Sequence, residues 1–104
     1  MLFRSARDDA ERATALRLSG RAHMLAARGA EAANTLNAAL ALDKQLGASA
    51  AIGLDLIYLG DNETHRAAHA AASDYYQRAL SVYAAAGNTT GAAAAKARLA
   101  GAAK

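Results

Sequence analysis

Three histidines and a few clustered carboxylates are the side chains in this sequence that could bind a metal ion or transfer protons. Asp61, His65 and His69 follow one another at intervals of four residues, the spacing that lines up metal ligands on one face of a helix. The repeat register described below, however, places a turn between His65 and His69, and a turn breaks that common face. We therefore predict that the two histidines are polar turn residues and that the chain binds no metal or other cofactor.

The other candidates for acid–base chemistry have structural explanations. Asp8, Asp9 and Glu11 follow Ser5, where a helix is expected to begin, and acidic side chains there stabilise the positive end of the helix dipole. His23 has no serine, cysteine or carboxylate fixed near it by the sequence, so we expect a partly buried packing residue. The glycines are dispersed and form no phosphate-binding loop. We predict that the protein is not an enzyme.

Composition favours a helical protein with few chemical options. Alanine occupies 33 of the 104 positions, proline is absent, and only four tyrosines and one phenylalanine are aromatic. The net charge of +3 comes from scattered lysines and arginines, which argues against a nucleic-acid partner. The sequence lacks cysteine, which excludes disulfides and thiolate zinc sites, and it has no apolar run long enough for a membrane span. We expect a cytoplasmic protein, or a periplasmic one if the true N-terminus precedes Met1.

The sequence repeats itself at an offset of 40 residues, which indicates a stacked array of similar units. The matched pairs are Leu16/Leu56, Gly20/Gly60, Ala32/Ala72, Ala39/Ala79, Leu40/Leu80 and Gly47/Gly87. Small residues in such pairs let a large side chain of the neighbouring helix approach closely, so we expect Gly20 and Ala32 to admit large neighbours such as Leu36. Tyr76 and Tyr83 are expected to pack in the core.

The same register predicts where the helices begin and end. Gly47 and Gly87 stand where a left-handed helix end is wanted, and Asn88 offers an N-cap to the last helix. Local chemistry would end a helix at Gly60, but the register requires the helix to continue through it. The result is an all-α single domain spanning residues 1–104, with helices near 5–27, 30–46, 49–66, 69–86 and 89–102.

Each unit carries two clusters of small and large residues, in the second copy Leu56-x2-Leu59-Gly60 and Ala72-x3-Tyr76-x2-Ala79. This pattern resembles the tetratricopeptide repeat, in the longer variant of bacterial regulators and scaffolds. The resemblance covers about two and a half repeats. Leu2 and Phe3 fall in register with the end of a second helix, so the chain is expected to be a piece of a longer array.

The resemblance implies a scaffold without catalytic activity, whose first helices line a concave groove for a peptide or a partner helix. The groove residues that it implies are Thr14, Arg17, Arg21, Met24, Leu54, Ile57, Asp61, Thr64 and Arg98. Arg17 and Arg21 favour an acidic or carboxylate-ended partner, with Leu54 and Ile57 as an apolar shelf. An alternative is a self-associating segment of a larger regulator or lipoprotein, forming homo-oligomers through its open repeat ends.

Overall fold

The computed structural model describes residues 5–102, and these form an all-α fold of five helices. The helices are α1 (Ala6–Leu25), α2 (Gly29–Leu46), α3 (Ser49–His65), α4 (His69–Ala85) and α5 (Thr89–Ala102). Their bounds agree with the predicted ones to within two residues at every end. Leu2 and Phe3, whose register suggested a preceding repeat, lie outside the described residues.

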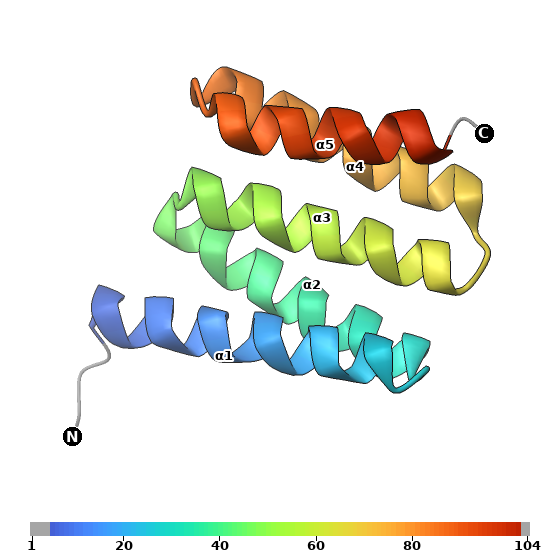
Figure 1. Cartoon of the computed structure of the whole chain (residues 1–104). Helices are drawn as coiled ribbons and strands as arrows, with labels where there is room; N and C mark the ends of the chain where they lie inside the picture. The colour runs from blue at the N-terminus through green and yellow to red at the C-terminus, as the bar shows by residue number, and fades with distance from the viewer. Residues whose placement is uncertain (1–4, 103–104) are drawn as a thin grey trace.

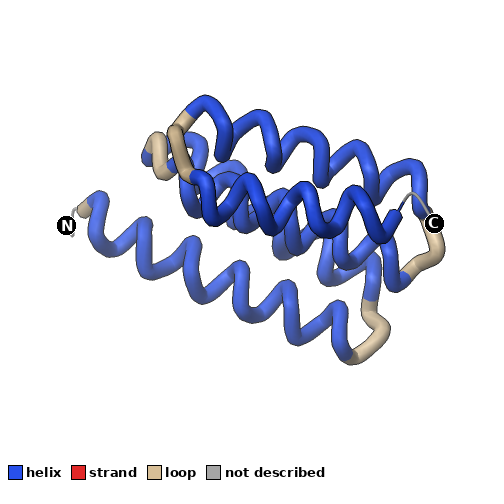
Figure 2. The backbone as a smooth tube through the Cα atoms, turned by 45° about the horizontal axis from the view of Figure 1, so that its top comes forward, coloured by secondary structure: helices blue, strands red, loops and turns tan. Residues whose placement is uncertain are grey.

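The five helices are arranged in two layers, with successive helices running in opposite directions (Figures 1 and 2). Each helix packs on the next along the chain, and α1 also contacts α3, which in turn contacts α5. The helices α1, α3 and α5 therefore form one layer, which faces the viewer in Figure 1, and α2 and α4 lie behind it. We call the exposed side of the α1–α3–α5 layer the front face, and we call the packing of α3 on α1 and α2 the first junction. The packing of α5 on α3 and α4 is the second junction.

Local chemistry explains the helix ends. The Ser5 hydroxyl accepts from the Asp8 amide at 3.1 Å, and the Asp8 carboxylate accepts from the Ser5 amide, which completes a capping box. Asn88 caps α5 as predicted, because its side-chain oxygen accepts from the Gly91 amide at 2.9 Å. Gly47 (φ 65°) follows α2 and Gly87 (φ 69°) follows α4, and both adopt the predicted left-handed conformation. The equivalent position in the other two turns holds an alanine.

The core confirms the expected pairing of small with large residues. A side chain at Gly20 would place its Cβ 2.6 Å from Leu36 Cγ, and a side chain at Gly60 would run into the Tyr76 ring. Tyr76 and Tyr83 are both buried, as predicted. The α3 helix continues through Gly60, which confirms the repeat register over the local signal for a helix end.

No described helix combines the length and apolar character needed to cross a bilayer.

Candidate functional site

Arg17 lies in a buried cluster of charged side chains at the first junction. Its Nη2 donates to Asp43 Oδ2 at 2.8 Å, and its Nε donates to Asp55 Oδ1 at 2.6 Å. The three residues come from three different helices, α1, α2 and α3 respectively. Arg17 is only 8% exposed, and both carboxylates are more deeply buried. The predicted role of Arg17 as a groove residue is wrong, because its guanidinium is enclosed and already bonded to two carboxyl groups.

The electrostatics of this cluster centre on Asp55. Burial lowers the pKa of Arg17, but the hydrogen bonds and charges of the two carboxylates outweigh it and raise that pKa above its usual value. Two carboxylates share this one cation, and Asp55 Oδ2 is buried without a hydrogen-bond partner. Burial, together with the neighbouring Asp43, raises the pKa of Asp55 to about 8. A proton on Asp55 therefore relieves both the unpaired oxygen and the excess negative charge.

The second junction replaces this charged cluster with apolar residues. Forty residues after Arg17, Asp43 and Asp55 stand Ile57, Tyr83 and Ala95, all three of them buried. The residues around these positions differ as well. Gly53 and Gly91 leave room for the Tyr83 ring, because a side chain at either position would run into it. The equivalent positions of the first unit hold Ala13 and Ala51. The two junctions thus use different side chains for the same backbone arrangement.

Other predicted groove residues divide between the front face and the interior. Met24 and Ile57 are buried, so they too are wrongly assigned to an exposed groove. The predicted residues that reach the surface at least in part are Thr14, Arg21, Leu54, Asp61, Thr64 and Arg98. On α1 the exposed large apolar side chains are Leu18 and Leu25, each one residue after a predicted groove residue. A shift of one residue turns a helical position by about 100°, enough to move it from the α3 contact to the front face.

Two side-chain contacts lie on the front face, one between α1 and α3 and one between α3 and α5. The Arg21 guanidinium lies over the Tyr58 ring, 5.5 Å from its centre. At the next step Arg98 forms an ion pair with Asp61, with Nε 2.8 Å from Oδ1 and Nη2 3.2 Å from Oδ2. These two contacts occupy the same place in successive repeats, because Asp61 stands 40 residues after Arg21 and Arg98 stands 40 residues after Tyr58. Among the described residues, the first junction therefore presents the cation Arg21 without an anion on this face, and the second presents the neutral pair of Arg98 and Asp61.

Two leucines flank Arg21 on α1. Leu18 is 58% exposed and Leu25 is 66% exposed, and they are the large apolar side chains that stand out to solvent in the described part of the chain. They lie on the front face because Gly20, which packs on Leu36 of α2, is on the opposite side of α1. The repeat carries a signal for their exposure, because Leu25 stands 40 residues before the polar His65 and Leu18 stands 80 residues before Arg98.

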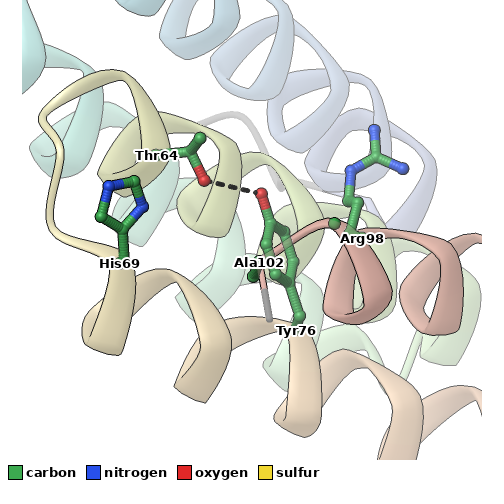
Figure 3. Close-up of a pocket in the computed structure, with 6 residues that line it drawn as sticks. Thr64, His69, Tyr76, Arg98 and Ala102 are labelled. Carbon is green, nitrogen blue, oxygen red and sulfur yellow. Dashed lines mark hydrogen bonds between the residues drawn. The ribbon is translucent and has the colours of Figure 1, made fainter. Parts of the chain in front are cut away.

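A pocket of about 550 Å³ opens at the second junction, lined by Thr64, His69, Tyr76, Arg98, Gly101 and Ala102. Figure 3 shows the Tyr76 hydroxyl directed toward Thr64, with His69 on one side of it and Arg98 on the other. The Tyr76 hydroxyl also donates to Asp61 at 2.7 Å. Burial, and to a smaller extent the Asp61 carboxylate, raise the pKa of Tyr76 to about 12, so it is a neutral phenol at physiological pH.

The repeat explains why this pocket is open. Forty residues before Thr64 and Ala102 stand Met24 and Asn62, which are buried at the first junction. Asn62 Nδ2 there donates to the Gly29 carbonyl at 3.0 Å. The second junction has the shorter threonine and alanine, and their smaller volume leaves a hollow.

His65 and His69 lie on either side of the turn that the repeat register predicts. His65 is the last residue of α3 and His69 the first of α4, so the predicted turn separates them, and the described residues contain no group of three potential metal ligands. His65 Nδ1 lies 3.0 Å from the Asp61 carbonyl, a local contact within α3. His23 is half-buried, as predicted.

Comparison of the chain with models of known protein families, with curated proteins and with solved structures finds no significant match.

Proposed function

We propose that this protein is a scaffold of the tetratricopeptide type, without catalytic activity, that binds a peptide or a helix of a protein partner on its front face. The helices α1, α3 and α5 form one continuous surface there. Stacked helix pairs characteristically bind partners on the surface lined by the first helix of each pair. Arg21, Tyr58 and Leu18 on this face belong to the residue types that dominate binding energy at protein interfaces or supply its apolar area.

The observation that supports this proposal is the contrast between packing and front-face positions in the two repeats. The pairs Gly20/Gly60 and Ala32/Ala72 keep the same residue where helices pack on one another, and all four residues are buried. On the front face, Leu18, Tyr58 and Arg98 occupy one repeat position and are apolar, aromatic and cationic in turn. A surface that only closed the fold would not need a different chemistry at each repeat, whereas a recognition surface does.

Selection of binders from a displayed library of random peptides tests the proposal. We expect the selected peptides to lose at least about tenfold in affinity with the double variant Arg21→Ala and Tyr58→Ala. The matched control changes two exposed residues of the other layer, Lys44→Ala and Gln77→Ala, and it should leave the affinity unchanged. Binders that depend on Lys44 and Gln77 instead, or failure to select any binder, would refute the proposal.

Self-association is the second candidate, and one feature of the first helix pair favours it. A hollow of about 340 Å³ lies between α1 and α2 and is lined by Arg12, Leu16, Ala38, Ala41, Leu42 and Gln45. A hollow of this kind can receive a side chain of a second copy, which would make the chain a structural segment of a larger assembly. Sedimentation velocity over a hundredfold concentration range decides the matter. A dimer that the variant Leu42→Glu dissociates supports self-association, and a monomer at every concentration excludes it.

A further inference from the structure

Leu18, Arg21 and Leu25 form one exposed row on α1, which we call the α1 stripe. They are spaced three and four residues apart, so they lie within about 60° of arc on the helix surface. Tyr58 of α3 lies beneath the Arg21 guanidinium and belongs to the same surface. The row thus presents a cation between two large apolar side chains.

Arg21 differs from the other cations of the first and second junctions in having no anion. Arg17 pairs with two carboxylates and Arg98 with one, whereas Arg21 makes no ion pair within residues 5–102. Its contact with the Tyr58 ring leaves the N–H groups at the edge of the guanidinium free to donate to a ligand. A carboxylate is the side chain that matches this planar set of donors.

The two leucines define the apolar part of the ligand and its conformation. Leu18 and Leu25 are seven residues apart, which is about 10 Å along α1 at 1.5 Å per residue. A second helix repeats apolar side chains at the same seven-residue interval and the same rise, so its row can pack against this one along its whole length. An extended peptide rises about 3.3 Å per residue and places every second side chain on one face, which does not match this spacing.

We propose that the α1 stripe binds an amphipathic helix of a partner protein that carries an acidic side chain between two apolar residues about one turn away on either side. The inference rests on the proposed function and names the partner chemistry and the part of the front face that recognises it. Arg21 bonds the carboxylate, and Leu18 and Leu25 bury the apolar residues beside it. The second junction does not offer the same site, because Asp61 already neutralises Arg98 and would repel the acidic side chain.

A set of three synthetic helices in an Ala-rich host tests the proposal by NMR titration of the isotope-labelled protein. The first carries Leu, Glu and Leu at positions i, i+3 and i+7, the second has Lys in place of Glu, and the third has Ala in place of both leucines. We expect the Glu helix to shift the amide resonances of residues 18–25 and 58. We also expect it to bind at least about tenfold more tightly than either of the others.

Two charge-reversal variants provide the matched comparison. Arg21→Glu should weaken the Glu helix by about tenfold or more and strengthen the Lys helix. Arg78→Glu is the control, because Arg78 lies over the Tyr75 ring at 5.4 Å, in the same kind of contact but on α4, and it should change neither affinity. Far-UV circular dichroism of both variants checks that the helices are intact.

The outcomes separate this inference from the broader proposal. Equal binding of the Glu and Lys helices, or equal weakening by Arg21→Glu and Arg78→Glu, would overturn the α1 stripe as an acidic-helix site. Library peptides that need Tyr58 and Arg98 but tolerate Leu18→Ser with Leu25→Ser would overturn it as well, while leaving the front face as the binding surface. Loss of Glu-helix binding in the Leu18→Ser and Leu25→Ser variant, with the fold retained, supports it.

Discussion

At the scale of single residues, the carboxyl group of Asp55 couples folding to pH. Its pKa is 3.8 in a model compound and is raised to about 8 by burial and by Asp43, so the folded chain holds this proton more tightly than the unfolded chain does. The stabilising contribution of the proton is therefore complete below pH 3.8 and is lost as the pH rises through about 8.

This coupling predicts that the free energy of unfolding falls between pH 5 and pH 9, with a slope of at most about 1.4 kcal/mol per pH unit from this group. Urea unfolding at a series of pH values measures it. Asp55→Asn keeps a neutral side chain at every pH, so it should flatten the slope and be more stable than the natural chain at pH 9. Asp74→Asn, on an exposed position of α4, is the control. An unchanged slope in Asp55→Asn would show that Asp55 is ionised throughout.

Two alanines hold a backbone conformation that disfavours them. Ala27 (φ 62°) and Ala67 (φ 60°) are left-handed at the turns after α1 and α3, where the turns after α2 and α4 use glycine. We expect Ala27→Gly to raise the stability by about 0.5–1 kcal/mol, since relief of this strain exceeds the added entropy of the unfolded chain. Thermal unfolding measures the gain. The control is the neighbouring Ala26, which has φ −87°, so Ala26→Gly should lower the melting temperature. A similar effect of both changes would contradict strain at Ala27 as the cause.

At the scale of helices and their junctions, the buried cluster of Arg17, Asp43 and Asp55 is not required for stacking, because the second junction stacks without it. Replacing a buried ion cluster with apolar residues of similar volume is often neutral or stabilising by about 1–4 kcal/mol, whereas removing one member costs about 3–5 kcal/mol. We therefore expect the triple variant Arg17→Met, Asp43→Val and Asp55→Val to be at least as stable as the natural chain.

Arg17→Met alone, in the same test, should be strongly destabilised, because it leaves the buried carboxyl groups of Asp43 and Asp55 without their cation and hydrogen-bond donor. Chemical denaturation of the two variants at pH 7 decides between the interpretations. We choose valine rather than tyrosine at position 43 because of its neighbours. Tyr83, the equivalent residue, packs against Gly53 and Gly91, whereas position 43 faces Ala13 and Ala51, which leave less room. A triple variant as unstable as the single one would show that the charges themselves hold the first junction together.

The same comparison of junctions shows what the sequence alone could predict. Helix ends followed from local chemistry at Gly47, Gly87 and Asn88, and the close helix contacts followed from the spacing of small and large residues. The burial of Arg17 did not follow, because its partners Asp43 and Asp55 lie on two other helices and meet it only in three dimensions. The repeat did contain a signal for this cluster, because Arg17, Asp43 and Asp55 align with Ile57, Tyr83 and Ala95 of the next unit. The exposure of Leu18 and Leu25 did not follow from the Ala-rich pattern of α1 itself, and only their repeat equivalents Arg98 and His65 indicated a surface position.

At the scale of the whole molecule, stability is distributed unevenly along the stack. The middle helices α2, α3 and α4 each have neighbours on more than one side and supply most of the buried residues, whereas α5 contributes only Ala95 to the buried set of the described residues. It is also held by the partly buried Ala92 and Leu99, which pack on the core, and by the ion pair of Arg98 with Asp61. In a repeat array each unit is held mainly by its immediate neighbours, so a helix with little buried area opens before the others.

Amide hydrogen exchange should therefore be fastest in α5 and slowest in α3 under native conditions. Arg98→Ala removes the ion pair that ties α5 to α3, and we expect it to raise exchange in α5 by several-fold while leaving α1 unchanged, because an exposed or half-buried ion pair contributes about 1 kcal/mol or less. Arg78→Ala, which removes a cation from α4 without an ion pair, is the matched control and should leave α5 unaffected. Exchange measured residue by residue by NMR tests this order. Protection in α5 equal to that in α3 would mean that the five helices unfold as one unit, and the front face of α5 would then be as rigid a binding surface as that of α1.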